Sequence, residues 1–316
     1  MEFRALGDTE LEVSVFTLGS WMTYETVSED QALAVIGRGI DAGINFFDDA
    51  RYDDYTGEAP METGYSEVLF GRLLHLGGWN RDDLVIANKL WYEFYPDEGP
   101  EEELDGSLFR LKMDYVDLVY CAPPSDAVSV AELVRQMEGL IQTGKARHWG
   151  LMLDWSTEEM EEAYEMASRE GMAVPCAIQM AYSLLNPSRA EDEATQAACR
   201  EAGLGIVSAR SLYGGLLTGK YNRGRGAMEG RFDEAEIEAM REEGLLEKID
   251  RVIELAEALD ATPAQVALAY CLKHDQVATI LFGATKPSQI EENVGALEIL
   301  PRMDADVMAE LRDLAE

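Results

Sequence analysis

Short apolar runs alternate with longer amphipathic stretches along the whole chain. The stretches at 28–43 and 157–171 carry apolar residues three and four positions apart among charged ones, which is the period of a surface helix. Ser28 and Thr157 stand at their starts, where an N-cap side chain accepts a backbone hydrogen bond. The apolar runs are rich in Val, Ile and aromatic residues, as buried strands are. There are eight of these runs: VFTLGSW (15–21), INFFDDA (44–50), DLVIANKL (83–90), YVDLVYCA (115–122), ARHWGLML (146–153), CAIQMAY (176–182), GIVSARSL (205–212) and VATILFGAT (277–285).

Eight strand–helix alternations predict parallel strands, because each helix must return the chain across the sheet before the next strand begins. Eight such units in 316 residues favour an α/β fold of the closed (β/α)8 TIM barrel type. An open dinucleotide-binding sheet would carry GxGxxG after its first strand, and no such motif follows residues 15–21. We expect one domain over residues 1–316, with a hairpin at 1–14 on the barrel floor and an extra C-terminal helix at 310–316.

The chain is strongly acidic. Its 61 Asp and Glu against 26 Lys and Arg give a formal net charge of −35. Such a charge repels nucleic acid and anionic membrane surfaces, so we exclude both as partners. Only seven of the basic residues are Lys, which fits either adaptation to high salt or an ordinary acidic protein.

The N-terminus has no basic segment followed by an apolar stretch, so it does not resemble a signal peptide. No apolar segment approaches the roughly 18 residues that span a bilayer. Cys121, Cys176, Cys199 and Cys271 show neither CxxC spacing nor a His at metal-ligand spacing, which predicts free thiols and no metal site. Together these features predict a cytoplasmic protein.

The strand ends carry the candidate chemistry, because barrel enzymes place their active sites at the C-terminal ends of the strands. The second run ends in Asp48 and Asp49, with Tyr52 and Tyr55 just beyond, and the third ends in Lys89. A buried Lys that pairs with Asp stays protonated and is expected to lower the pKa of a nearby phenol. Such a phenol exchanges protons near neutral pH, so the combination indicates acid–base catalysis. Each residue alone also has a structural explanation, as a helix cap, a surface ion pair or a strand-end aromatic.

Several longer motifs resemble the aldo/keto reductase superfamily, most closely the branch that contains the potassium-channel β-subunits. They extend over nearly the whole chain: RALGDTELEVS (4–14), INFFDDA (44–50), LVIANKLW (84–91), YVDLVY (115–120), GKARHWG (144–150), AIQMAYSLLN (177–186), GGLLTGKY (214–221) and LFGATKPSQIEENVGAL (281–297). The resemblance implies an NADPH-dependent reductase of carbonyl compounds, with an Asp, a Tyr, a Lys and usually a His in its active site. Asp48 and Lys89 match the family's Asp and Lys.

The resemblance also implies where NADP(H) binds. The residues expected to contact it are Ser20, Trp21, Gln179, Leu212, Gly215, Lys220, Gly283, Thr285, Gln289 and Asn293. Arg210 and Ser211 stand where relatives usually have Ser-Pro, so contacts to the diphosphate or nicotinamide are expected to differ there. Lys220, Arg231 and Lys286 would attract the negative cofactor to this acidic chain, and the basic stretch 221–231 has either this role or none. The helix beginning near Ser288 would present free N–H groups to the adenosine phosphate.

Two departures from the family pattern affect the chemistry. The family Tyr is expected five residues after the Asp, and Asp53 stands there. The loop that follows is longer than usual, so we expect Tyr52 as the proton donor, then Tyr55, then Tyr65. Ala122 occupies the position of the family His, which removes a donor worth roughly a hundredfold in rate or makes room for a bulkier substrate.

The leading hypothesis is an NADP(H)-dependent oxidoreductase that acts on a small carbonyl compound. Tyr52 would protonate the carbonyl oxygen, Lys89 would tune the phenol, and Asp48 would hold the lysine. An aromatic pocket would be formed by Trp21, Trp91, Tyr92, Tyr95 and Tyr213. The alternatives are a redox-responsive module that binds NADPH and turns it over little, and a retained fold with altered chemistry on a sugar or natural-product intermediate. The substrate, the direction of reaction and the oligomeric state stay open.

Overall fold

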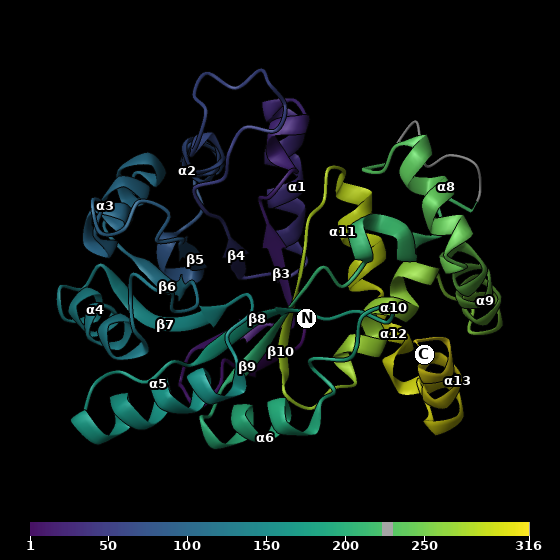
Figure 1. Cartoon of the computed structure of the whole chain (residues 1–316). Coiled ribbons are helices and arrows are strands. Elements are labelled where there is room, and N and C mark those ends of the chain that lie inside the picture. Colours follow the sequence, from purple (N-terminus) through teal and green to yellow (C-terminus); the bar gives the residue numbers. More distant parts are fainter. Residues whose placement is uncertain (223–229, 316) are drawn as a thin grey trace.

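Eight parallel strands close into a barrel in the order β10-β3-β4-β5-β6-β7-β8-β9, which confirms the predicted fold. The structure is a computed structural model that describes residues 1–222 and 230–315, so Arg223 and Arg225 of the basic stretch lie outside the described residues. Each of these eight barrel strands, which Figure 1 shows at the centre of the molecule, lies within one of the predicted apolar runs. The strands are β3 (Phe16–Gly19), β4 (Phe46–Asp48), β5 (Val85–Leu90), β6 (Val116–Cys121), β7 (Ala146–Met152), β8 (Ala177–Ala181), β9 (Gly205–Ala209) and β10 (Val277–Phe282).

Helices surround the strands on the outside of the barrel (Figure 1). The α-helices are α1 (Glu29–Asp41), α2 (Tyr65–Gly77), α3 (Pro100–Leu111), α4 (Val130–Gln142), α5 (Thr157–Glu170), α6 (Glu193–Glu201), α8 (Glu234–Glu242), α9 (Leu245–Ala258), α10 (Pro263–Leu272), α11 (Pro287–Val294), α12 (Ala296–Ile299) and α13 (Ala305–Ala315). The short 3-10 helices are η1 (Tyr24–Thr26), η2 (Arg81–Asp83), η3 (Tyr213–Thr218) and η4 (Leu300–Arg302). Helix α13 is the predicted extra C-terminal helix, and it packs against α9.

One of the two predicted helix caps is confirmed and the other is wrong by one residue. The Ser28 side chain accepts a hydrogen bond from the backbone N–H of Gln31, as an N-cap does. At α5 the cap is Ser156, which is extended and forms a reciprocal capping box with Glu159. Thr157 is therefore the first residue inside the helix.

The N-terminal hairpin closes the floor of the barrel, as expected. Its strands β1 (Phe3–Ala5) and β2 (Glu12–Ser14) pair antiparallel. Leu6 and Val13 are fully buried and pack with the inward-facing residues of the barrel strands. The guanidinium of Arg4 donates to the carbonyl of Val277 at 2.5 Å, at the start of β10. With this end filled, the opposite end of the barrel is the one left for a ligand.

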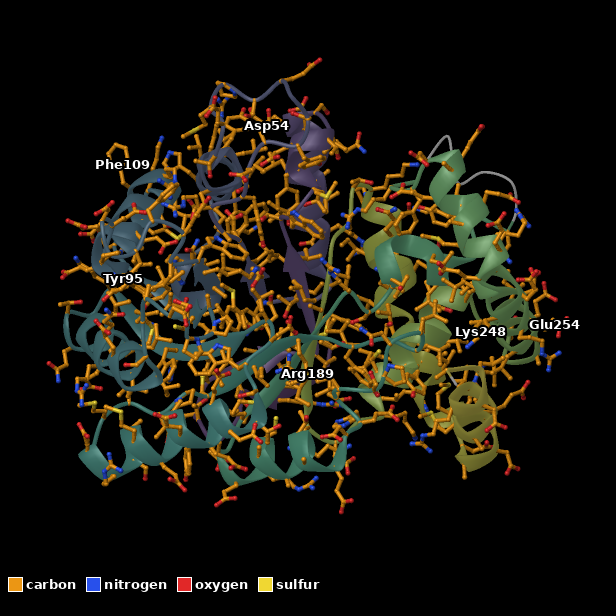
Figure 2. All side chains as sticks on the ribbon, viewed as in Figure 1. Asp54, Tyr95, Phe109, Arg189, Lys248 and Glu254 are labelled. Carbon is orange, nitrogen blue, oxygen red and sulfur yellow. The ribbon has the colours of Figure 1, made fainter. Side chains whose placement is uncertain are left out.

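The outer surface is densely charged, and side chains such as Lys248 and Glu254 extend from it into solvent (Figure 2). Phe109 of α3 is an exception, since this aromatic side chain is 84% exposed. No helix in residues 1–222 or 230–315 is both long and apolar enough to cross a membrane.

Candidate active site

Asp48, Lys89 and Tyr52 meet at the C-terminal end of the barrel. Asp48 is the last residue of β4, and Lys89 lies near the end of the neighbouring strand β5. The Lys89 ammonium forms an ion pair with Asp48 Oδ1 and also donates to the Tyr52 hydroxyl at 2.7 Å. Asp48 and Lys89 are 2% and 3% exposed, so this ion pair is shielded from solvent. The structure thus brings together the three residues predicted to be catalytic.

A fourth side chain fixes the carboxylate from across the barrel. Gln179 of β8 donates from Nε2 to Asp48 Oδ2 at 2.9 Å. Both oxygens of Asp48 therefore have a donor. This satisfies a carboxylate that would otherwise be costly to bury, and it holds Lys89 in one position.

The lysine leaves the hydroxyl proton of Tyr52 free. An ammonium group has donors only, so the phenolic oxygen must accept from Lys89 Nζ. The O–H of Tyr52 can then point toward a ligand. Burial, followed by the nearby charges of Asp48, Asp49 and Glu67, raises the pKa of Tyr52 well above its ordinary value. The prediction that the phenol's pKa is lowered is thus wrong for this structure, and burial is the largest cause of the difference.

The segment that carries Tyr52 is tied down on both sides. The Tyr52 carbonyl accepts from the Gly64 N–H at 2.8 Å, which closes the long loop between β4 and α2. Asp54 organises the tip of this loop, accepting from the backbone N–H of Thr56 and Ala59 at 2.8 and 3.0 Å (Figure 2). This closure brings the phenol to Lys89 although Tyr52 is one residue early by the family spacing.

Arg51, the residue before Tyr52, anchors this segment to α3. Its guanidinium pairs with Glu98 at 2.9 Å and Glu103 at 3.2 Å. The same Glu103 carboxylate accepts from the backbone N–H groups of Trp91 and Tyr92, at 2.9 and 3.2 Å. One buried carboxylate therefore joins the tyrosine loop to the segment that follows β5. Sequence reasoning missed both Arg51 and Glu103.

The other two candidate tyrosines lie elsewhere. Tyr55 is 39% exposed, and burial and the nearby Glu25 raise its pKa to about 12. Tyr65 is the first residue of α2. Of the three candidates, Tyr52 is the one hydrogen-bonded to Lys89 in the described part of the chain.

Ala122 lies on the inner face of the barrel, where it packs with the interior cluster. It directly follows β6, and its N–H donates to the Leu90 carbonyl at 3.1 Å. The three histidines of the chain do not replace it. His75 is in α2, His148 lines a hollow near the hairpin on the barrel floor, and His274 lies in the turn between α10 and β10.

The expected aromatic wall forms in part. The Tyr52 ring lies between those of Trp21 and Trp91, with ring centroids 6.4 and 6.0 Å away. Tyr92 and Tyr95 pack together, and their hydroxyls donate to Gln136 and Glu132 of α4 at 3.0 and 2.5 Å, so these phenols are committed to structural contacts. Tyr213 begins η3.

A second buried acid pair lies behind Asp48. Asp49 and Glu67 are both fully buried. Asp49 Oδ1 accepts from Ser20 Oγ and from the Ala50 N–H, while its Oδ2 is buried with no partner among the described residues. Glu67 accepts from Asn88 Nδ2 at 2.8 Å and from Arg110 Nε at 2.5 Å.

Sequence reasoning did not assign Glu67 a role. A signal was present, because Glu67 stands three and seven positions before Phe70 and Leu74 on the buried face of α2. Its acidic group therefore occupies a core-facing position of the helix.

Asp49→Asn is expected to stabilise the fold at neutral pH. Burial, then the charge of Glu67, raises the pKa of Asp49 well above its ordinary value. The folded state therefore binds the extra proton, and stability falls as pH rises from about 4 through the folded-state pKa. Asn keeps the acceptor Oδ1 and removes the charge, so the free energy of unfolding should rise by about 1–3 kcal/mol at pH 7 and change little at pH 3.

Urea denaturation at several pH values measures this effect. Asp53→Asn, at an exposed carboxylate of the same loop, is the matched control and should leave stability nearly unchanged. A lower stability of Asp49→Asn at every pH would contradict the prediction.

Two guanidinium groups flank Trp21 at the barrel mouth. Arg210 and Arg231 lie 5.7 and 4.7 Å from the Trp21 ring centroid. Burial lowers the pKa of Arg231, and neighbouring Arg210 lowers it further. In residues 1–222 and 230–315 neither arginine pairs with a carboxylate, although the chain has 61 acidic residues. Two clustered cations without a carboxylate fit the phosphates of a dinucleotide.

The other predicted cofactor residues lie in the segments after β9 and β10. Gly215 is in η3 with φ of +91°, and a Cβ there would meet Lys220 Nζ at 2.8 Å, so this turn requires glycine. Leu212 immediately precedes η3. Gly283 is equally confined, because a Cβ would lie 2.4 Å from Thr23.

The N-terminus of α11 is less open than predicted. The backbone N–H groups of Thr285 and Lys286 donate to Gln289 Oε1 at 2.8 and 3.0 Å, so these two donors are already occupied. Asn293, on the same helix, is buried. Ser20 and Gln179 are likewise engaged, with Asp49 and Asp48. To bind a cofactor, these polar groups would have to give up their present hydrogen bonds or form additional ones.

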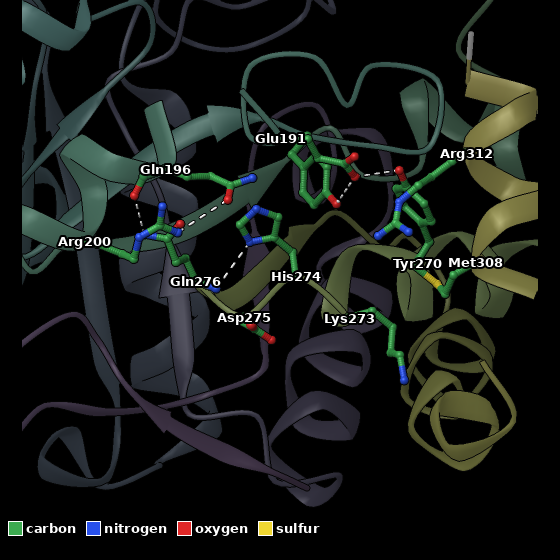
Figure 3. Close-up of a pocket in the computed structure, with 11 residues that line it drawn as sticks. Glu191, Gln196, Arg200, Tyr270, Lys273, His274, Asp275, Gln276, Met308 and Arg312 are labelled. Carbon is green, nitrogen blue, oxygen red and sulfur yellow. Dashed lines mark hydrogen bonds between the residues drawn. The ribbon is translucent and has the colours of Figure 1, made fainter. Parts of the chain in front are cut away.

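A hollow of about 260 Å³ opens beside α6, α10 and α13 (Figure 3). Within it Glu191 Oε1 accepts from the hydroxyls of Tyr182 and Tyr270 at 2.9 and 2.6 Å. His274 donates from Nε2 to the Ala190 carbonyl at 3.0 Å and accepts at Nδ1 from the Gln276 N–H at 3.2 Å. Lys273 is directed away from Glu191 (Figure 3). Neither Asp48, Tyr52 nor Lys89 lines this hollow, so it is separate from the candidate active site.

Comparison with known proteins agrees with the resemblance that the motifs carry. The sequence model of the aldo/keto reductase family matches residues 16–316. The chain is 32% identical to a probable voltage-gated potassium channel subunit beta of Oryza sativa subsp. japonica and 30% identical to one of Arabidopsis thaliana, covering 100% of this chain and 97% of each relative. A putative subunit of the same kind from Schizosaccharomyces pombe is 32% identical over 99% of this chain and 92% of its own length. The chain therefore belongs to the aldo/keto reductase family.

Proposed function

We propose that this aldo/keto reductase family member is an NADP(H)-dependent oxidoreductase that reduces an aldehyde or ketone to an alcohol. One contact supports this proposal most strongly. Lys89 Nζ donates to the Tyr52 oxygen at 2.7 Å, which leaves the phenolic proton available to a substrate oxygen. An enclosed Lys–Asp pair beside a protonated phenol is the arrangement expected of a general acid.

Each residue of the site has a separate role in the proposed reaction. When bound, the reduced nicotinamide supplies a hydride to the carbonyl carbon. Tyr52 gives its proton to the carbonyl oxygen, and the product is an alcohol. The raised pKa of Tyr52 keeps the phenol protonated until this step. Lys89, held by Asp48, then stabilises the phenolate that Tyr52 becomes.

Arg210 and Arg231, which pair with no carboxylate in the described part of the chain, support a phosphorylated cofactor. A net charge of −35 repels an anionic dinucleotide, and Arg210 and Arg231 supply opposite charge at the mouth. Arg210, Trp21 and Arg231 would hold the phosphates, with Lys220 and Lys286 near the adenosine end.

The purified protein, NADPH and a panel of aldehydes and ketones test the proposal. We expect steady loss of nicotinamide absorbance with at least one carbonyl compound, and weaker activity with NADH at equal concentration. NADPH binding, followed separately by fluorescence, shows whether the cofactor site forms. Tight binding without turnover on any carbonyl compound would refute the reductase proposal.

The second candidate is a redox-responsive module that binds NADPH and turns it over slowly. Ala122 is the observation that favours it, since a methyl group neither donates a hydrogen bond nor moves a proton. The relatives named as probable channel β-subunits also suggest a role in binding a partner protein. The same panel separates the two candidates, because only the module predicts tight binding with a single slow turnover.

A further inference from the structure

Trp91 carries a hydrogen-bond donor for which the described residues supply no acceptor. Its indole Nε1 is buried and has no partner among the residues that the structure describes. The other buried indoles behave differently, since Trp149 and Trp155 donate to the backbone carbonyls of Ala173 and Cys121 at 2.7 and 3.0 Å. An orphaned buried donor costs about 1–3 kcal/mol, so its retention calls for a reason.

The position of Trp91 relates it to the missing histidine. It follows β5 two residues after Lys89, so strand alternation places it on the inner face of the barrel. Leu90 pairs with Cys121 between β5 and β6, so Trp91 and Ala122 are the next residues at the same level on neighbouring strands. Both pack with the interior cluster of the barrel. The small side chain at 122 leaves space on this wall that a large neighbour can use.

The indole also faces the proton donor. The Trp91 and Tyr52 rings have centroids 6.0 Å apart and planes at 61°, an edge-to-face arrangement. Glu103 fixes the backbone on both sides of this pair, because it accepts from Trp91 N and pairs with Arg51. A substrate oxygen placed at the Tyr52 hydroxyl would therefore lie beside the indole.

We propose that Trp91 Nε1–H is the second hydrogen-bond donor to the substrate's carbonyl oxygen, in place of the side chain lost at Ala122. This inference rests on the proposed reductase function. Trp91 keeps its proton throughout, and Tyr52 supplies the one that is transferred. The donor is already removed from water in the folded protein, so it does not lose a water partner when the carbonyl oxygen binds. Because the atom is enclosed, the indole must turn toward the phenol as the carbonyl compound enters.

Trp91→Phe tests the role of the donor while keeping an aromatic ring. We expect kcat to fall about ten- to a hundredfold, with the Kd for NADPH unchanged. Trp79→Phe is the matched control, since Trp79 lies between α2 and η2 on the floor side of β5, and its kcat should stay within twofold. Adding Ala122→His to the Trp91→Phe variant returns a donor to the same wall and should recover part of the lost kcat. Full activity of Trp91→Phe would overturn the proposal.

An NMR experiment tests the donor role of Trp91 even if the variant folds poorly or the wild type lacks turnover. The chain has five tryptophans, so ¹⁵N-indole labelling gives five N–H signals that Trp→Phe variants assign. With NADP⁺ present, adding an aldehyde or ketone should shift the Trp91 N–H proton downfield and leave Trp79 unmoved. An unmoved Trp91 signal in a saturated complex would overturn the donor role. Absence of turnover alongside a shifted signal would instead refute the reductase proposal.

Discussion

Replacing Tyr52 with Phe should lower kcat/KM for carbonyl reduction by about 10²- to 10⁴-fold, because the variant lacks the one phenolic hydroxyl that is hydrogen-bonded to Lys89 in the described chain. The ring contacts to Trp21 and Trp91 do not need the hydroxyl, so the fold and the Kd for NADPH should be nearly unchanged. Steady-state kinetics and a fluorescence titration with NADPH measure the two quantities on one preparation.

Tyr55→Phe is the matched control for this variant. Tyr55 belongs to the same loop but is partly exposed and lies near Glu25 and Arg231. Its loss should change kcat/KM by less than about threefold, within the range of surface substitutions. Equal losses in the two variants would remove Tyr52 from its role as proton donor.

Lys89→Met should cost both stability and activity. Removing one partner of a buried ion pair leaves the other charge uncompensated, which costs about 3–5 kcal/mol. Asp48, 2% exposed, would keep the hydrogen bond from Gln179, the one other side-chain donor that it has among the described residues. The phenolate formed by Tyr52 would also lose its neighbouring cation, so kcat should fall by at least about a hundredfold.

The double variant Asp48→Asn with Lys89→Met separates these two effects. It removes both charges, so most of the stability lost in Lys89→Met should return. Urea denaturation of the two variants measures this difference. Activity should stay as low as in Lys89→Met, since Tyr52 would still lack the ammonium group of Lys89. If the double variant were less stable than either single variant, the pair would have to contribute through packing and not through charge compensation.

Much of the barrel, and the meeting of Asp48, Lys89 and Tyr52, could be predicted from the sequence. The eight apolar runs fixed the strands because parallel strands buried on both faces are apolar throughout. Asp48 and Lys89 were predicted to meet because both end neighbouring strands, and adjacent strands present their ends at the same rim. Tyr52 was preferred over Tyr55 from the length of the loop, and the hydrogen bond between Gly64 and the Tyr52 carbonyl shows how the loop achieves this.

Features that depend on burial and side-chain direction could not be predicted. The pKa of Tyr52 is raised and not lowered. The direction of this shift depends on how far the phenol is removed from water and on the nearby charges of Asp49 and Glu67. The occupied N–H groups at the start of α11 depend on how the Gln289 side chain folds back. The sequence shows that Trp91 has an N–H donor, but it cannot show whether an acceptor lies within reach. The lack of a partner among the described residues is seen only in the structure.

The position of Glu103 has a consequence for how the protein can change its substrate. This residue lies on α3, outside the barrel, yet its two oxygens set the separation between the loop bearing Tyr52 and the segment bearing Trp91. A shorter Asp at position 103 would draw the two segments together. A neutral Gln there would weaken the interaction with the Arg51 guanidinium. Divergence in the size of accepted carbonyl compounds can therefore arise from a helix that never touches the substrate.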